Sequence, residues 1–520
     1  MTAATSAAAA ATSAAADATR PFPTAASADI GLLLEGTYPY VAGGVSSWVH
    51  QIIRAFPEYR FALAFLGSTP ADYSGMKYTL PDNVVHLETH YIHSGSDKPP
   101  VRAQAGDPAV YGLVKRLHEY FREPRQHPDA VIGEALAAIS AKGGLSDASF
   151  LHSRASWDYT VEQYRSRSRD PSFIDYFWTV RTMHQPLWML ARVAEGFPQV
   201  RAYHSVSTGY AGFLAAMLRW KTRRPLLLSE HGIYTKERKI DLFQSEWIKD
   251  NRDPFDRDPA EIGYLRQLWI RFFESLGRMC YAAADDIVSL YEANRLRQIA
   301  DGAPAERTQC VPNGIDLPRL AALRAKRPAG DPPQVLCLLG RVVPIKDVKT
   351  FIRAIRVVAN RLPQAEGWIA GPEDEDPEYA EECRALAASL GVADKVKFLG
   401  FQKIDELLPK VGLLVLSSIS EALPLVVLEG NAAGVPSVCT DVGSCRQLIY
   451  GLEGEDAALG ASGRVVGIAD PTALAGAAIE LLQPEAWRAA QAAGIRRVEK
   501  YYTQDRMFDS YRSLYKKALA

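Results

Sequence analysis

Several features are scarce or missing in this sequence, and each absence excludes a class of protein. Its 520 residues include only six cysteines, none in a Cys-x-x-Cys pair, so free thiols are a simpler interpretation than disulfides or a zinc site. No apolar run reaches the ~18 to 20 residues that a membrane helix needs. The formal net charge of -1 provides no field to attract a polyanion, so we expect no nucleic-acid partner.

The N-terminal segment 1–27 is dominated by alanine, with threonine and serine. It has neither the basic start nor the Leu-rich stretch of a secretory signal peptide. We interpret it as a disordered or transiently helical tail and leave it out of the fold. Together with the lack of a membrane helix, this predicts a cytoplasmic protein, one that can also lie peripherally at the inner membrane face.

The length predicts two domains, because a single core stops growing near ~250 to 300 residues. Apolar runs alternate with helical patterns in two series, which is typical of parallel sheets with helical crossovers. The first series has expected strands at 30–34, 61–66, 84–87, 202–203, 226–229 and 287–290. The second has them at 335–339, 367–370, 396–399, 413–416 and 437–440. We therefore predict an α/β fold with two doubly wound domains.

Changes in composition set the expected domain limits. A charged, proline-bearing stretch at about 94–177 interrupts the first series, and we interpret it as a helical insertion. The N-terminal domain then covers 28–322 and the C-terminal domain 323–500, with the boundary near a polar, proline-rich segment. Apolar residues at helical spacing in 501–520 predict a final helix that packs back on the N-terminal domain.

Two cations follow the first strand of the second series. Arg341 comes one glycine after the strand at 335–339, and Lys346 lies five residues further on. Ligands of open parallel sheets bind beyond the carboxyl ends of the strands, and a diphosphate needs charge-assisted donors. Surface charges on a solvated loop are the alternative, but the position at a strand end favours a phosphate-binding pair.

Two carboxylates stand near the end of the strand at 413–416. Glu421 and Glu429 are separated by seven residues, with a helix expected to begin at about Leu425. Carboxylates accept hydrogen bonds from the vicinal hydroxyls of a sugar or ribose, and the amides at the helix start can meet a phosphate or sugar. Alternatively, Glu429 only complements the helix dipole and Glu421 is solvated.

The first series offers weaker candidates. Gly43 and Gly44 leave room for close backbone approach before a helix, although a tight turn made for packing explains them equally well. His231 follows the strand at 226–229 and can orient a substrate hydroxyl, whereas a lone histidine is more often structural. His204 is a similar, weaker case.

An acidic run, Glu373-Asp374-Glu375-Asp376, contains the Asp-x-Asp spacing of some divalent-metal sites. It lies between Gly371-Pro372 and Pro377, which favours a solvated turn that begins the next helix. We predict no required metal and no cofactor.

With these residues in place, the chain resembles the retaining glycosyltransferases of family 4 from about Ile30 to its C-terminus. The motifs that carry the resemblance are Glu421-Ala-Leu-Pro-Leu-Val-Val-Leu-Glu429, Gly340-Arg-Val-Val-Pro-Ile-Lys346 and Val311-Pro-Asn-Gly-Ile-Asp316. The segments Glu35–Pro39, Gly43–Val45 and Glu230–Tyr234 resemble the Pel-like branch, which serves exopolysaccharide synthesis.

The resemblance implies the GT-B architecture, two Rossmann-like domains that face each other across a cleft. It implies that Arg341 and Lys346 hold the diphosphate of a nucleotide sugar, with Gly43 and Gly44 near the phosphates. Glu429 would bind the ribose and Glu421 the transferred sugar, with His231 on that sugar's opposite side. Leu425 begins the helix between the two glutamates and belongs to the same donor site.

The implied reaction is retaining and metal-independent. The implied donor is a UDP-linked hexose or N-acetylhexosamine, and the acceptor is a growing polysaccharide. An inner-membrane polymer synthase complex is the implied partner. Because no carboxylate is obviously set as a nucleophile, we favour attack on the same face as the leaving diphosphate.

Two residues depart from the family pattern on the sugar side. Ala422 stands where many relatives have glycine, and Gln447 where an acidic residue is common. Two other functions stay open: a nucleotide-sugar epimerase on the same fold, and a non-catalytic sugar-nucleotide sensor in a polymer synthase complex.

Overall fold

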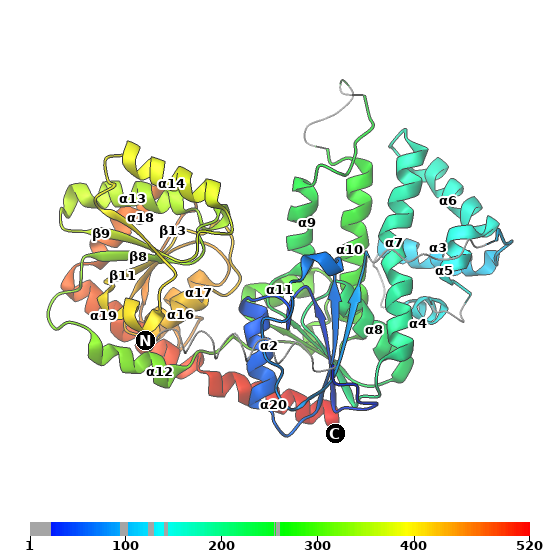
Figure 1. The fold of residues 1–520 in the computed structure, drawn as a ribbon, viewed down its shortest axis with the longest axis horizontal. Helices are drawn as coiled ribbons and strands as arrows, with labels where there is room; N and C mark the ends of the chain where they lie inside the picture. The colour runs from blue at the N-terminus through cyan, green and yellow to red at the C-terminus, as the bar shows by residue number, and fades with distance from the viewer. Residues whose placement is uncertain (1–21, 94–101, 123–128, 140–143, 254, 256–260) are drawn as a thin grey trace, which may run out of the picture. The chain divides into compact units, whose positions relative to one another are not determined.

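The computed structural model of the chain describes residues 22–93, 102–122, 129–139, 144–253, 255 and 261–520 (Figure 1). These residues form two compact units. Unit 1 runs to Val288 and also includes Arg297–Gln309 and Arg512–Ala520. Unit 2 comprises Ser289–Leu296 and Cys310–Tyr511. The tail expected at 1–27 falls outside the described residues up to position 21.

Unit 1 is built on a seven-stranded sheet with the order β3-β2-β1-β4-β5-β6-β7. Its strands are β1 (Ile30–Glu35), β2 (Phe61–Gly67), β3 (Val84–Tyr91), β4 (Ala202–Ser205), β5 (Leu226–Glu230), β6 (Asp286–Ser289) and β7 (Thr308–Cys310). β1 pairs in parallel with both β2 and β4. All residues of β2 are buried, which is typical of a parallel sheet covered on both faces.

The helices of unit 1 include those of the expected insertion. After α2 (Gly44–Ala55), the insertion carries α3 (Pro108–Arg122), α4 (Asp129–Ala138), α5 (Asp147–His152), α6 (Arg154–Arg167) and the start of α7 (Phe173–Gly196). The expected insertion also covers 94–101, 123–128 and 140–143, which lie outside the described residues. The later helices are α8 (Tyr210–Thr222), α9 (Tyr234–Gln244), α10 (Tyr264–Ala283) and α11 (Glu292–Ala300), the last of which extends into unit 2.

Unit 2 is built on a six-stranded sheet with the order β10-β9-β8-β11-β12-β13, and all five strand pairings are parallel. The strands are β8 (Val335–Leu339), β9 (Glu366–Ala370), β10 (Val396–Gly400), β11 (Leu413–Leu416), β12 (Ser437–Thr440) and β13 (Gly463–Val466). Numbered within the unit, this is the order 3-2-1-4-5-6 of the dinucleotide-binding fold. The predicted fold class, α/β with two Rossmann-like parallel-sheet domains, is therefore confirmed.

Helices cover both faces of this second sheet (Figure 1). One core packs α13 (Val348–Arg361), α14 (Pro377–Ser389) and α18 (Pro471–Leu481) against the strands. The other contains residues of α12 (Leu317–Ala321), α15 (Ile404–Leu407), α16 (Leu425–Ala432) and α17 (Cys445–Tyr450). Residues of α19 (Pro484–Tyr501) enter both cores.

Two edge strands escaped the sequence analysis, which found the other eleven. β7 has three residues and β13 has four, and several of their side chains are exposed or half-buried. Neither strand shows the continuous apolar run of a central strand, because an edge strand has a neighbour on one side only.

The last helix, α20 (Gln504–Leu519), ends within unit 1. The hydroxyl of Tyr515 hydrogen-bonds Nδ1 of His204 at 2.8 Å, and Nζ of Lys517 lies 2.6 Å from Oδ1 of Asp286. The final turns of the chain are thus held against the internal strands β4 and β6 of unit 1.

All six cysteines are free thiols, five of them buried and Cys310 exposed. Within the described ranges, no helix combines the length and apolar character needed to cross a membrane.

The buried Arg497 of α19 generates a prediction about stability. Its guanidinium donates to Oδ1 of Asp456 at 2.7 Å and to the carbonyls of Ile449, Asp456 and Gly460. Removing one partner of a buried pair leaves the other charge unpaired, so R497M should lower the unfolding free energy of unit 2 by about 3 to 5 kcal/mol. Urea denaturation followed by tryptophan fluorescence measures this. R496M is the matched control, because Arg496 is exposed, and an equal loss there would contradict the account.

Candidate functional site

The strand order of unit 2 reverses between β8 and β11, and the loops after these strands form the candidate site. In a doubly wound sheet the crossovers lead away in opposite directions at this point, which opens a crevice at the carboxyl ends. The two loops are joined where they leave the sheet. The amide of Ile419 donates to the carbonyl of Ile345 at 2.9 Å, and the hydroxyl of Ser417 donates to the carbonyl of Lys346 at 2.8 Å.

An ion pair connects the two loops above these contacts. Nζ of Lys346 lies 2.5 Å from Oε1 of Glu421, and the side chains are only 21% and 15% exposed. The hydroxyl of Ser418 donates to the same carboxylate oxygen at 2.7 Å. The structure thus brings together two residues that the sequence analysis assigned to different parts of a donor. Because the pair is largely shielded from water, it interacts more strongly than a surface pair.

Arg341 lies at the end of β8 and faces a carboxylate from the neighbouring strand's loop. Its Nη1 is 2.5 and 2.6 Å from the two carboxylate oxygens of Glu375. Both side chains are about half exposed, at 52% and 51%. The sequence analysis placed Glu375 in a solvated acidic turn and did not connect it with Arg341. The pairing could have been inferred from the strand order, because β8 and β9 are parallel neighbours and the loops that follow them leave the sheet side by side.

The turn after β12 holds the Glu421 loop in place. The amide of Ser444 donates to the carbonyl of Ala422 at 2.9 Å. Gly443 has a φ of +53°, and a Cβ there would lie 2.4 Å from the carbonyl oxygens of Glu421 and Ala422. Glycine is therefore required at this position for both conformation and space. Gln447, one of the two departures from the family pattern, accepts a hydrogen bond from the amide of Glu292 and donates one to the hydroxyl of Tyr502.

Glu429 lies on α16, the helix that Leu425 begins and Pro424 precedes. Burial raises the pKa of its carboxyl to about 7, Arg319 lowers it and Asp405 raises it. Arg319 and Asp405 form their own ion pair at 2.9 Å. Near neutral pH, Glu429 is therefore a mixture of carboxylic acid and carboxylate. Both forms accept hydrogen bonds, and the acid also donates one, which suits a vicinal diol.

In unit 1, the glycine pair begins α2 at the carboxyl end of β1. Both glycines are exposed, and a Cβ on Gly43 or Gly44 would meet nothing within 4 Å. Gly43 has an extended backbone that any residue adopts, at a φ of 168°. Neither packing nor backbone conformation therefore requires glycine here, which removes the tight packing turn as an explanation. The amides at the start of α2 remain open to close approach.

His231 follows β5 and is packed against α2. Its ring centroid lies 4.5 Å from that of Trp48, with the rings tilted by 69°. The side chain is only 8% exposed, and burial lowers the pKa of its imidazole to about 4. Its Nε2 has no hydrogen-bond partner among the described residues. His231 is thus a neutral imidazole, next to the helix that the glycine pair begins.

His204, the weaker candidate, has a structural role. It is fully buried, with Nδ1 bonded to the hydroxyl of Tyr515 and Nε2 to that of Ser229. Burial lowers the pKa of this imidazole to about 3. Both nitrogens are occupied within the fold, so neither is left for a substrate.

Two carboxylates at strand ends of unit 1, the half-buried Glu35 and the buried Glu230, were not singled out from the sequence. Glu35, the last residue of β1, accepts from the hydroxyl of Tyr234 and the amide of Ala211, each at 3.1 Å. Glu230, the last residue of β5, accepts bonds of 2.6 to 2.9 Å from Thr208, Tyr281 and Gln298. Burial raises the pKa of both carboxyls. Their position at the ends of β1 and β5 was the signal that could have identified them. Glu230 directly precedes His231 and Glu35 binds Tyr234, so the two carboxylates hold the chain on either side of His231.

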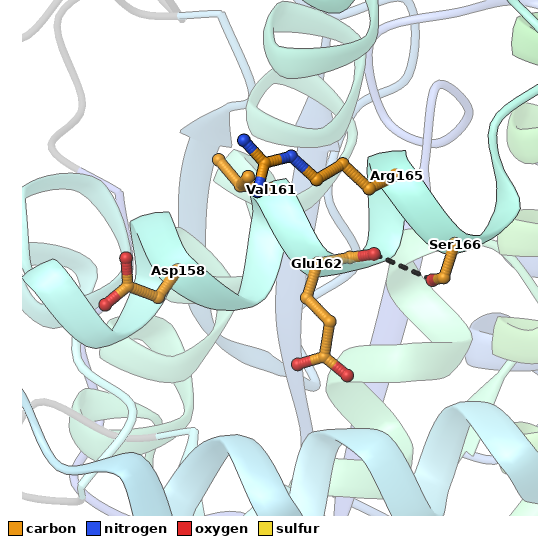
Figure 2. A pocket seen from close by; sticks show the side chains of 5 residues that line it. All are labelled: Asp158, Val161, Glu162, Arg165 and Ser166. Atoms are coloured by element: carbon orange, nitrogen blue, oxygen red, sulfur yellow. Dashed lines mark hydrogen bonds between the residues drawn. The ribbon is translucent and has the colours of Figure 1, made fainter.

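A hollow of about 500 Å³ lies elsewhere, on α6 of the insertion. Figure 2 shows the side chains that line it, which are Asp158, Val161, Glu162, Arg165 and Ser166. All five come from one helix, and Ser166 bonds the carbonyl of Glu162 within that helix. A depression with walls from a single element does not enclose a ligand, and none of the predicted site residues lines it.

The raised pKa of Glu429 generates a prediction. Because folding raises the pKa from 4.5 to about 7, the folded state binds this proton more tightly. The associated stability is present below about pH 4.5 and is lost as the pH rises through about 7. E429Q removes the cost of burying a carboxylate, so it should be more stable than wild type at pH 8, by up to about 3 kcal/mol.

Urea denaturation at pH 8 and at pH 4.5 measures the difference, which should disappear at the lower pH. E406Q is the control, because Glu406 is exposed on α15. A pH-independent difference for E429Q would contradict a carboxyl whose pKa is raised to about 7 by folding.

Comparisons with known proteins follow the division into two units. Residues 28–306 match the family model described as Domain of unknown function (DUF3492), and residues 321–497 match Glycosyl transferases group 1. The D-inositol 3-phosphate glycosyltransferase of Salinispora arenicola is 30% identical over 247 residues, 46% of this chain and 53% of the relative. That of Acidothermus cellulolyticus is 32% identical over 218 residues, 39% of this chain and 47% of the relative. The chain thus spans about half the length of these curated relatives.

Solved structures are similar in fold over 94% of the chain. Anabaena Alr3699/HepE in complex with UDP has a TM-score of 0.54 and 14% identity, with all of that chain covered. Sucrose-phosphate synthase from Thermosynechococcus elongatus has a TM-score of 0.52 and 16% identity, with 98% of that chain covered. The chain therefore belongs to the family described as Domain of unknown function (DUF3492), and its residues 321–497 are similar to the glycosyl transferases group 1.

Proposed function

We propose that this protein is a retaining glycosyltransferase that moves a sugar from a UDP-linked donor to a growing exopolysaccharide. The observation that carries the proposal is the ion pair of Lys346 and Glu421 at the strand-order reversal of unit 2. In this proposal Lys346 binds the phosphates and Glu421 binds the transferred sugar, and the two side chains lie within one hydrogen bond of each other. The diphosphate and the sugar of a nucleotide sugar are joined through one oxygen. The side chains that bind these two groups must therefore also lie close together.

The nucleotide end of the donor fits the remaining residues of unit 2. Arg341 binds the diphosphate together with Lys346, and Glu429 accepts hydrogen bonds from the ribose hydroxyls. UDP is the proposed nucleotide, which is supported by the similar fold of Alr3699/HepE in its complex with UDP. The two cations supply the positive charge that the departing diphosphate needs, so we propose a metal-independent reaction.

The proposed chemistry follows from the state of Glu421. Its carboxylate is neutralised by Lys346 and also accepts a bond from Ser418, which leaves it a poor nucleophile. We therefore propose attack by the acceptor hydroxyl on the face that the diphosphate leaves. The C–O bond to the diphosphate breaks, the new glycosidic bond forms, and the leaving phosphate oxygen takes the hydroxyl proton. Retention of the anomeric configuration results.

Unit 1 contributes a neutral hydrogen-bonding group in this proposal. Burial lowers the pKa of His231 to about 4, so its imidazole carries no charge during turnover. We propose that the unpartnered Nε2 bonds a hydroxyl of the donor sugar. The open amides after Gly43 approach the phosphates.

The exopolysaccharide acceptor and its setting rest on the motif resemblance. Segments Glu35–Pro39, Gly43–Val45 and Glu230–Tyr234 resemble the Pel-like branch. We propose that the protein works in the cytoplasm or peripherally at the inner membrane face, together with a polymer synthase complex.

The first test measures nucleotide release from a panel of UDP, GDP and ADP sugars, with an oligosaccharide acceptor. UDP sugars should be turned over best. R341A and E421A should each lower kcat/KM by roughly 100-fold or more, because each removes a charge that acts on the transition state. R353A, which changes an exposed arginine of α13, should keep the wild-type rate.

Wild-type rates in both R341A and E421A would contradict the site assignment. Conversion of the donor sugar without transfer or hydrolysis would indicate an epimerase instead. Donor binding without turnover, even with membrane partners present, would indicate a sensor.

The second test determines the anomeric configuration of the product by NMR spectroscopy, with EDTA in the reaction. The product should keep the configuration of the donor, and turnover should continue without divalent cations. Inversion, or a covalent sugar trapped on Glu421, would overturn the proposed mechanism.

A further inference from the structure

The contact between Arg341 and Glu375 is built into the fold. The two residues lie on the loops that follow the parallel neighbours β8 and β9. These loops are joined backbone to backbone, since the amide of Val342 donates to the carbonyl of Pro372 at 3.0 Å. A Cβ on Gly371 would lie 1.9 Å from the carbonyl oxygen of Gly340, so only glycine allows this approach. The loop after β9 is thereby fixed beside Arg341.

The other acids of the same turn have separate tasks. Asp376 caps α14, with its Oδ1 accepting from the amide of Tyr379 at 3.0 Å. Glu373 pairs with Arg384 of α14. Glu375 lies between these two anchored residues and reaches Arg341 with both carboxylate oxygens. The turn is therefore anchored on both sides of Glu375, whose carboxylate contacts the guanidinium of Arg341.

This contact has a consequence for a diphosphate at the same guanidinium. Both carboxylate oxygens of Glu375 occupy Nη1 of Arg341, so a diphosphate that binds this guanidinium competes with them for Nη1. A bound diphosphate would also carry its negative charge next to the carboxylate, and like charges at such a distance repel. The pair of Lys346 and Glu421 differs, because Glu421 has a proposed task on the sugar, whereas Glu375 has none on the donor.

We propose that Glu375 competes with the donor's diphosphate for Arg341 and so sets the affinity for UDP and its sugars. The inference rests on the proposed function, because it takes Arg341 as a phosphate ligand. Without donor, Glu375 neutralises the guanidinium. With donor bound, the carboxylate moves away, and its return to Arg341 speeds the release of the nucleoside diphosphate.

The exposure of the pair fits this role. Both side chains are about half exposed, and exposed ion pairs contribute little to folding. The carboxylate can therefore leave Arg341 without disturbing the fold. For the same reason, substitutions at position 375 should leave thermal unfolding unchanged, so that a change in binding is not a change in folding.

The test compares the UDP affinity of wild type, E375Q and D374N by isothermal titration calorimetry. E375Q should bind UDP roughly three- to tenfold more tightly, because it removes a competing like charge next to the phosphates. D374N is the matched control, with the same change in net charge one residue away. It should stay within about twofold of wild type, since long-range charges are screened by salt.

A double-mutant cycle with Arg341 completes the test. In an R341A background, E375Q should lose most of its gain, because there is no guanidinium left to compete for. Equal effects of E375Q and D374N, or weaker UDP binding by E375Q, would overturn the inference. Wild-type protein that does not bind UDP at all would contradict the proposed function, and this inference with it. UDP binding that E375Q leaves unchanged would contradict the inference alone.

Discussion

The ion pair of Lys346 and Glu421 depends on one constraint, the parallel strand order of unit 2. Because β8 and β11 are neighbours whose crossovers leave in opposite directions, their loops meet at the carboxyl edge of the sheet. The backbone bond between Ile419 and Ile345 fixes the meeting point, and the ion pair lies above it. The acidic turn after β9 reaches Arg341 for the same reason, since β9 is the other neighbour of β8.

Burial shifts the pKa values of several titratable side chains in both units. In unit 2, burial raises the pKa of Glu429 to about 7, which prepares it for hydroxyl groups rather than cations. In unit 1, burial lowers the pKa of His231 to about 4 and raises that of Glu230 beside it. Three donors hold Glu230, whereas Nε2 of His231 has no partner among the described residues. A buried polar atom without a hydrogen-bond partner costs desolvation free energy, and a hydrogen bond with a ligand hydroxyl would offset this cost.

The fold was largely predictable from the sequence, because central parallel strands are continuous apolar runs. The runs at 335–339 and 413–416 match β8 and β11 residue for residue. The short edge strands β7 and β13 lack such runs and were missed. Strands that are buried on both faces can thus be located from the local sequence pattern.

The sequence singled out candidate residues for the site, but it did not show their pairings. Position after a strand identified Lys346 and Glu421, yet nothing in the sequence shows which loops touch. The partnership of Arg341 with Glu375 follows only from the order of the strands. The contacts of Gln447 with Glu292 and Tyr502 were not predictable either, because the direction of a long side chain depends on packing that the sequence does not reveal.

The central claim is that Arg341 and Lys346 hold the diphosphate of a nucleotide sugar. A crystal structure of the protein with UDP tests it most directly. The account predicts that Arg341 and Lys346 both lie within hydrogen-bond distance of phosphate oxygens, that Glu429 contacts the ribose, and that Glu375 has left Arg341. A UDP molecule bound away from the loops after β8 and β11, with the pairs of Arg341 with Glu375 and Lys346 with Glu421 unchanged, would contradict it.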